Sequence, residues 1–141
     1  MLKVTIICVD KLREKYLREA AAEYEKRLSA YCNLKTAEVS DDEGLKAALP
    51  KKAYKIALCI EGKQLSSEEL AEKIEDIAVR GYSELAVLIG GTDGMGEDVK
   101  AMCDLRLSFS KMTFPHPLMR VILLEQLYRA MNISAGGRYH H

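Results

Sequence analysis

The sequence lacks most of the patterns that assign a chain to a class at once. Its four cysteines form no C-x-x-C pair, so their spacing indicates neither a zinc site nor a disulfide framework, and we expect buried free thiols. No apolar run approaches the roughly 20 residues that a membrane span requires. The apolar start meets charge at Asp10 and Lys11 without a signal-peptide pattern. We therefore expect a cytoplasmic protein without a membrane partner.

An excess of charge of one sign is also missing. The 21 Lys and Arg balance 21 Asp and Glu, which leaves a formal net charge of zero, so net charge does not indicate a nucleic acid partner. The distribution is uneven, because residues 106–141 carry five Lys or Arg and all three histidines but a single acid, Glu125. If the protein has a basic face, we expect it to be C-terminal.

Patterns for hydrolytic and metal chemistry are absent as well. The sequence has no Ser/His/Asp order, no close His/Glu spacing and no clear carboxylate pair, so we expect no metal. The content of 48% hydrophobic and 30% charged residues is typical of a compact domain, and 141 residues leave little room for two. We expect residues 1–141 to form a single domain.

Short apolar stretches alternate with amphipathic stretches along the chain, which predicts an α/β fold with a mainly parallel sheet and helices on both faces. The first helix is expected to bury a stripe of residues four apart: Leu12, Tyr16, Ala20, Tyr24 and Leu28. Strands are expected at residues 2–9, 34–39, 55–60, 85–89 and 105–109, and helices at residues 11–31, 41–49, 66–81, 97–103 and from 117 onward.

Glycines cluster directly after the most hydrophobic expected strand, in residues 90–96 (GGTDGMG). Ligands of open parallel sheets bind beyond the carboxyl ends of the strands, and glycine permits close approach of the backbone. The spacing matches neither the dinucleotide fingerprint nor the P-loop, and Glu97 and Asp98 would repel a phosphate there. The loop is either a tight turn or a site for a ligand that is not held through phosphate.

Two further segments are candidates for chemistry. Residues 107–117 place Ser, Thr, two Phe and two Pro around His116. This segment either encloses a purine ring or forms only a core strand and a turn. In the second case His116 merely caps the next helix. The chain ends with a Gly-Gly pair that would let a terminus fray and a His pair that suggests a tag remnant. Arg138 and Tyr139 argue for function, because sites that modify RNA use Arg for phosphate, Tyr for stacking and His for proton transfer.

Four segments in order along the chain and the closing Tyr139-His140 pair resemble a known family. The segments are residues 58–63 (LCIEGK), 89–94 (IGGTDG), 107–116 (LSFSKMTFPH) and 120–130 (RVILLEQLYRA). They are similar to the ribosomal RNA large-subunit pseudouridine N3-methyltransferase family over essentially the whole chain, and the last two segments are highly specific.

That family belongs to the SPOUT superfamily, so the resemblance implies an α/β domain with a C-terminal trefoil knot that works as a homodimer. It also implies S-adenosylmethionine as the cofactor, held in the knot by three loops. A cofactor without phosphate agrees with the absence of a phosphate fingerprint. Residue by residue, the resemblance assigns cofactor binding to Leu58, Gly90, Phe109, Ser110, Lys111, Met112, Thr113 and Phe114.

The implied reaction is methylation of N3 of a pseudouridine in a hairpin loop of large-subunit (23S) rRNA, on the assembled 70S ribosome. A loop base is accessible to a protein, whereas A-form RNA hides its major groove. We expect Tyr139, His140 and Arg138 to serve catalysis through stacking, proton handling and phosphate contact. The expected RNA contacts are Arg120, Arg129, Arg138 and His116.

The tail departs from the family pattern, because Gly137-Arg138 precedes the Tyr-His pair and His141 follows it. The family usually places a His or acidic residue and a Pro or Ala before the pair, and a Lys after it. A small neutral chain also offers little surface to an RNA hairpin, which favours a shared dimer face.

The alternatives to a methyltransferase are a regulatory α/β module that binds a nucleotide without chemistry and a ribosome-associated binding protein without the reaction.

Overall fold

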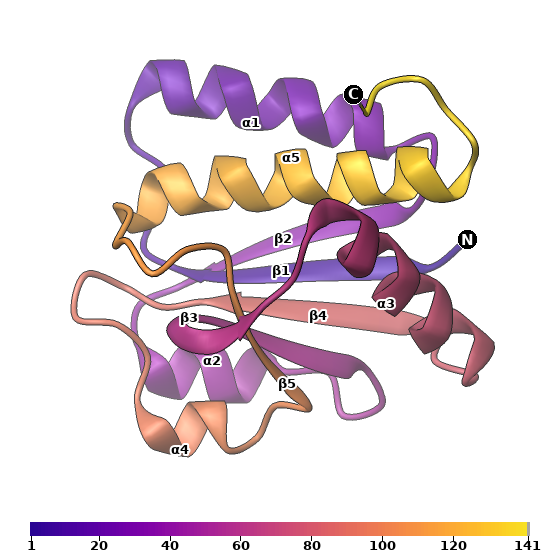
Figure 1. The fold of residues 1–141 in the computed structure, drawn as a ribbon. Coiled ribbons are helices and arrows are strands. Elements are labelled where there is room, and N and C mark those ends of the chain that lie inside the picture. The colour runs from indigo at the N-terminus through magenta and orange to yellow at the C-terminus, as the bar shows by residue number, and fades with distance from the viewer. Residues whose placement is uncertain (141) are drawn as a thin grey trace.

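The computed structural model describes residues 1–140, in which five strands alternate with five helices (Figure 1). The strands form one sheet in the order β2-β1-β4-β3-β5, and all neighbouring strands are parallel. This confirms the predicted α/β fold. The elements are β1 (Lys3–Val9), α1 (Lys15–Leu28), β2 (Asn33–Val39), α2 (Asp42–Ala48), β3 (Tyr54–Gln64), α3 (Ser67–Val79), β4 (Glu84–Ile89), α4 (Glu97–Lys100), β5 (Leu105–Ser108) and α5 (His116–Ser134).

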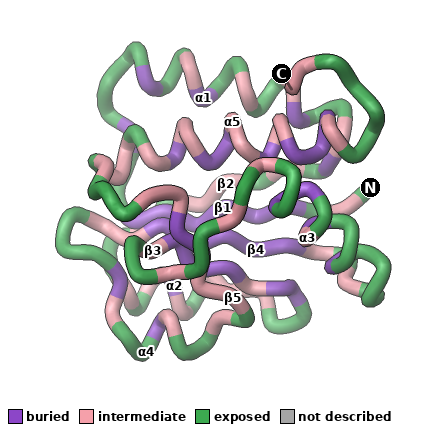
Figure 2. The backbone as a smooth tube through the Cα atoms, in the orientation of Figure 1, coloured by how far each residue is buried: buried purple, intermediate pink, exposed green. Residues whose placement is uncertain are grey.

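Helices cover both faces of the sheet, as predicted. Successive side chains of a strand point to opposite faces, so Ile6 of β1 packs in the core beneath α1, α3 and α5, whereas Ile7 packs against α2 and α4. Both side chains are fully buried. Figure 2 shows the buried residues concentrated along the strands and on the inner sides of the helices.

The predicted stripe of α1 is right at its two ends, because Leu12 and Leu28 are buried, but it is wrong at Tyr16. Leu12 lies before the helix, and the side chain of Tyr16 is 70% exposed. The buried residues are Leu17, Ala21 and Leu28. A strict spacing of four drifts by about 40° per step around a helix of 3.6 residues per turn, so a straight buried face has to combine steps of four and three.

The fifth strand lies between two parts of the third. Leu107 pairs with Leu58 and also with Lys63, and the register of β3 shifts between these two partners. Residues 59–62 therefore cross from one edge of β5 to the other. Gly62 lies at the crossing, where a Cβ atom would come within 2.7 Å of the backbone of Arg106 and Leu107. This wrapping of β3 around β5 fits the trefoil knot that the resemblance implies.

Helix α5 lies, along the chain, between the two regions in which function is expected. It packs against α1 and α3, and its 19 residues span about 28 Å. Figure 1 shows that it begins near the carboxyl ends of the strands and that the chain turns back over the helix after its other end. The helix thus connects the loop at residues 107–117 to the tail at residues 135–140.

Candidate cofactor cavity and C-terminal cluster

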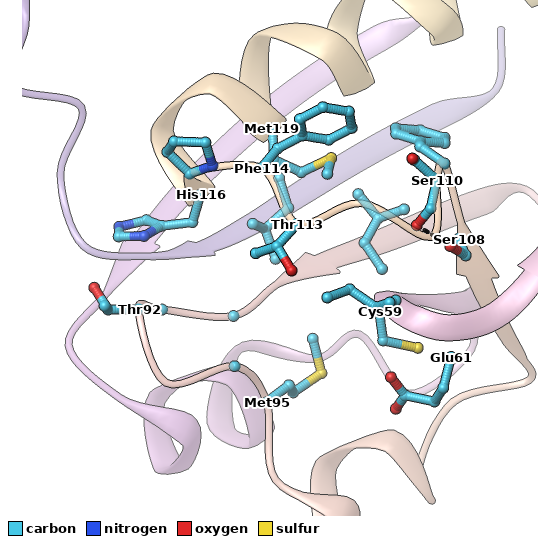
Figure 3. Close-up of a pocket in the computed structure, with 18 of the residues that line it drawn as sticks. Cys59, Glu61, Thr92, Met95, Ser108, Ser110, Thr113, Phe114, His116 and Met119 are labelled. Carbon is cyan, nitrogen blue, oxygen red and sulfur yellow. Dashed lines mark hydrogen bonds between the residues drawn. The ribbon is translucent and has the colours of Figure 1, made fainter.

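A cavity of about 730 Å³ opens at the carboxyl ends of β4 and β5, beside residues 58–61 of β3 (Figure 3). This is the edge at which parallel sheets bind ligands. Seven of the eight residues to which the resemblance assigns the cofactor line the cavity, whereas the exposed Lys111 does not. The seven are Leu58, Gly90, Phe109, Ser110, Met112, Thr113 and Phe114.

The glycine-rich loop is both a tight turn and part of the cavity wall. The Gly94 N–H donates to the Gly91 carbonyl at 2.9 Å, and Gly94 has a φ of 79°, which favours glycine. A Cβ atom at Gly90 would lie 2.9 Å from the backbone of Gly94 and Met95. The loop is therefore a tight turn, as one of the two alternatives states, and the turn also brings backbone and the Met95 side chain to the cavity.

Serine side chains shape the segment that follows β5. The Ser108 hydroxyl donates to the Ser110 carbonyl, and the Ser110 hydroxyl accepts the Met112 N–H, both at 2.9 Å. This folds the segment so that Phe109 and Phe114 face the cavity, and both rings also border a second cavity of about 340 Å³ beside α3 and α5. The segment thus forms part of the walls of both cavities.

His116 lies at one end of the cavity and does not cap α5. The N-cap position is Pro115, and His116 is the first helical residue. Its Nε2 atom lies 3.5 Å from Oδ2 of Asp10, a residue with a φ of 73° directly after β1. Figure 3 shows His116 near Thr92 and far from Glu61 along the cavity. The imidazole thus joins the end of β1 to the start of α5.

The charges around the cavity do not suit a phosphate. Of the described residues that line it, Lys100 is the only Lys or Arg, and this Lys is already paired with Glu61. The hydrogen bond from Lys100 lowers the pKa of Glu61. Phosphate sites usually combine several cationic or backbone donors, so the cavity suits a ligand without phosphate.

The four cysteines are free thiols, but only two are fully buried. Cys8 and Cys32 are buried, whereas Cys59 and Cys103 are half-buried, so the expectation of buried thiols is half right. Burial raises the pKa of Cys8, Cys32 and Cys103 to about 11. These thiols are therefore protonated at neutral pH and weakly nucleophilic.

The C-terminal residues fold back over α5. Gly136 turns the chain with a φ of 74°. The Gly137 N–H then donates to the Asn132 carbonyl at 2.8 Å, and the Asn132 side-chain oxygen accepts the Tyr139 N–H at 3.1 Å. The Gly-Gly pair thus makes an ordered turn.

Tyr139 is held by residues of α5. Its hydroxyl donates to Glu125 at 2.9 Å, its ring packs on Tyr128 with centroids 4.8 Å apart, and the Arg129 guanidinium lies 4.7 Å from its centroid. Burial, with the hydrogen bond to Glu125, raises the pKa of Tyr139 to about 12. The phenol is therefore protonated at neutral pH, which suits stacking or donation rather than proton acceptance.

His140 bridges α5 and α3. Its Nδ1 atom lies 3.0 Å from Nη1 of Arg129, and its Nε2 atom contacts the Glu68 carboxylate. Since a guanidinium can only donate, these partners assign Nδ1 as the acceptor and Nε2 as the donor. None of the described tail residues lines the larger cavity. Tyr139 and His140 therefore form a separate C-terminal cluster within one chain.

Arg120 is buried, which speaks against the phosphate contact expected from the sequence. Its guanidinium donates to Glu38 at 2.9 Å and to the Asp10 carbonyl at 3.0 Å, and its side chain is 9% exposed. The Leu12 N–H donates to the same Glu38 carboxylate. Arg120 thus ties α5 to the ends of β1 and β2.

This ion pair predicts an acid-sensitive part of the stability. Burial opposes ionisation of Glu38, but the bonds from Arg120 and Leu12 outweigh it and lower its pKa. The pKa of a Glu side chain in an unfolded chain is about 4.3. Because the pKa of Glu38 is lower in the folded protein, the ion pair stabilises the fold at pH values above about 4.3, and this stabilisation is lost as the pH falls through the folded-state pKa. We expect Glu38→Gln to cost about 1 kcal/mol at pH 7, reduced by the partial exposure of Glu38. Urea denaturation should show the difference shrinking below about pH 4; a difference independent of pH would contradict this assignment.

The remaining expected RNA contacts differ in exposure. Arg138 is exposed, whereas Arg129 and His116 are half-buried. Arg129 is further held by Glu125 and His140. In the described part of the chain, the expected basic C-terminal face is therefore broken up by ion pairs.

Comparison with known sequences identifies the class of protein that this fold and cavity define. The profile of the family described as "Predicted SPOUT methyltransferase" matches residues 2–140. The chain belongs to the SPOUT methyltransferase family, which confirms the resemblance drawn from its motifs.

Two full-length relatives are named as methyltransferases of one particular RNA, the large-subunit rRNA. The chain is 49% identical, over 158 aligned residues, to the protein named Ribosomal RNA large subunit methyltransferase H in Bifidobacterium adolescentis and to the protein of that name in Clostridium novyi. Each alignment covers 99% of this chain and 99% of the relative.

Solved structures of methyltransferases share the fold. A probable methyltransferase from Bordetella pertussis Tohama I superposes with a TM-score of 0.63 at 11% identity, over 92% of this chain and 96% of that one. TrmJ from Z. mobilis ZM4 gives a TM-score of 0.60 at 8% identity, over 92% of this chain and 70% of that one. At this identity the likeness concerns the fold alone.

Two further findings concern residues 1–140. No group of three or more His, Cys, Asp or Glu in this range is placed to hold a metal ion. No helix in the same range is long and apolar enough to cross a membrane.

Proposed function

We propose that the chain transfers a methyl group from S-adenosylmethionine to N3 of a pseudouridine in a hairpin loop of 23S rRNA within the assembled 70S ribosome. Full-length relatives named as large-subunit rRNA methyltransferases support rRNA methylation. The observation that carries the proposal is the gathering of seven predicted cofactor residues around one cavity. A ribosomal substrate would put the protein in the cytoplasm.

The cavity fits S-adenosylmethionine in size and chemistry. Leu58 and Phe114 supply apolar walls for an adenine ring. The same wall includes Phe109, Ser110, Met112 and Thr113. The sulfonium of the cofactor supplies an activated methyl group. The protein's part is then to hold the cofactor, exclude water and align the target nitrogen.

The Phe114 ring is expected to support cofactor binding and not RNA binding. It faces the cavity from the loop before α5 (Figure 3). We predict that Phe114→Ala weakens S-adenosylhomocysteine binding about tenfold, from the lost apolar contact, while ribosome affinity stays within about twofold. Calorimetry and ribosome co-sedimentation measure the two quantities. Unchanged affinity for S-adenosylhomocysteine would count against this cavity as the cofactor site.

A homodimer would bring the C-terminal cluster to a cavity. Because none of the described tail residues lines the cavity of its own chain, we propose that the tail of one subunit acts at the cavity of the other. Tyr139, protonated at neutral pH, would stack on the target base, and His140 would accept the N3 proton at Nδ1 after the bound RNA displaces Arg129 from that atom. Arg138, which is exposed, and Arg129 would contact phosphates.

Methyl transfer from labelled cofactor tests the proposal. Purified protein is incubated with tritium-labelled S-adenosylmethionine and either free rRNA or assembled ribosomes from a strain that lacks the activity. We expect label on the rRNA of assembled ribosomes and little on free rRNA. Cofactor binding without label on either substrate would favour a ribosome-associated protein without the reaction.

A further inference from the structure

Two oppositely charged side chains meet on the wall of the larger cavity. Lys100, the last residue of α4, donates to the carboxylate of Glu61, and both residues line the cavity. The Lys100 side chain is 14% exposed and that of Glu61 is 53% exposed. The ammonium is therefore largely enclosed, and the carboxylate lies at the opening. Figure 3 shows Glu61 beside Cys59, at the opposite end of the cavity from His116.

Both charges are carried by rigid parts of the fold. Glu61 precedes Gly62, whose backbone crosses β5 so closely that a Cβ would clash. Lys100 follows Val99, a residue of α4 whose side chain is fully buried against the sheet. Preorganised charges bind a ligand at a lower cost in side-chain entropy than mobile charges do. The pair is thus built into the cavity.

The pair matches the amino acid end of the proposed cofactor. S-adenosylmethionine ends in an ammonium and a carboxylate on one carbon, and the carboxylate requires a cationic donor. Of the described residues that line the cavity, Lys100 is the only Lys or Arg. At the other end of the cavity, His116 already faces Asp10.

We propose that Lys100 binds the carboxylate and Glu61 the ammonium of the cofactor's amino acid end, while the adenosine end lies against residues 109–114. The inference rests on the proposed function. It makes this ion pair the element that fixes the direction in which the cofactor lies, and hence the position of the methyl group. Nothing in the cysteine, glycine or tail patterns of the sequence points to Lys100.

A comparison of two ligands tests the proposal. S-adenosylhomocysteine has the amino acid end, whereas 5′-methylthioadenosine has the same adenosine and thioether without it. By calorimetry, Lys100→Met should weaken binding of S-adenosylhomocysteine at least about tenfold, and binding of 5′-methylthioadenosine by less than about twofold. Retained affinity for 5′-methylthioadenosine also shows that the variant is folded. Arg106→Met is the matched control, because Arg106 pairs with Glu97 nearby but does not line the cavity.

A third ligand assigns the two ends. Decarboxylated S-adenosylhomocysteine keeps the ammonium, so its affinity should fall in Glu61→Gln and not in Lys100→Met. Equal weakening of all three ligands by Lys100→Met, or no weakening of S-adenosylhomocysteine, would overturn the proposal. If the wild-type protein binds 5′-methylthioadenosine and S-adenosylhomocysteine equally well, the inference fails while the proposed function stands; if it binds neither, the proposed function fails.

Discussion

Replacing Gly62 with Ala is expected to destabilise the protein by about 3 kcal/mol or more. The new Cβ would lie 2.7 Å from backbone atoms of Arg106 and Leu107, and backbone atoms of a paired strand cannot move aside as a flexible side chain can. The clash occurs where β3 passes around β5, so relieving it would disturb the pairing of Leu107 with both Leu58 and Lys63. Equilibrium urea denaturation at a fixed protein concentration measures the effect.

Gly81→Ala is the matched control for the crossing. Gly81 has a φ of 97°, and a Cβ at this position would meet no atom within 4 Å, so this substitution imposes backbone strain without crowding. It should cost about 1–2 kcal/mol. If Gly62→Ala were no more destabilising than Gly81→Ala, residues 59–62 would not cross β5 as closely as described.

Replacing His140 with Ala is expected to lower the rate of methyl transfer about 100-fold or more, because general acid–base groups contribute factors of that size. The affinity for S-adenosylhomocysteine should stay within about twofold, since no described tail residue lines the cavity. Single-turnover assays on assembled ribosomes measure the rate, and calorimetry measures the affinity.

Glu68→Gln is the control for this prediction. It weakens the contact between α3 and His140 but leaves the imidazole in place, so the rate should fall less than about threefold. A loss as large as that of His140→Ala would mean that the contact with α3, and not proton handling, accounts for the effect.

Mixed dimers test whether the tail acts on the partner subunit. The cofactor is kept well below the Kd of the Phe114→Ala cavity, so that sites with this cavity contribute little. In a mixture of Phe114→Ala and His140→Ala chains, each heterodimer then has one intact site, built from the cavity of the His140→Ala chain and the tail of the Phe114→Ala chain. Random exchange then restores about one quarter of the wild-type activity. If each tail served its own cavity, mixing would restore none.

The order of elements could be predicted because it follows from local patterns, whereas the residues of the cavity wall were assigned through the resemblance to a known family. Parallel strands end at one edge of a sheet, so the segments after residues 58, 89 and 108 had to meet there. Helix α3 was expected from residue 66, and Ser66 is its N-cap, in a capping box with Glu69.

The parts that could not be predicted depend on contacts between distant residues. Arg120 looks like a phosphate ligand until the fold brings it to Glu38, 82 residues away. Lys100 and Glu61 are 39 residues apart, and nothing in their local sequence indicates a shared cavity wall. The need for glycine at position 62 follows only from its crossing of β5.

The identity of the methylated atom tests the central claim most directly. After reaction with labelled S-adenosylmethionine, rRNA from assembled ribosomes is digested to nucleosides, and the labelled nucleoside is identified by mass spectrometry against standards. The account predicts N3-methylpseudouridine, which should be missing when the ribosomes carry uridine in place of pseudouridine at the target. Label on another atom or another nucleoside would contradict the proposed reaction, even though the chain belongs to the SPOUT methyltransferase family.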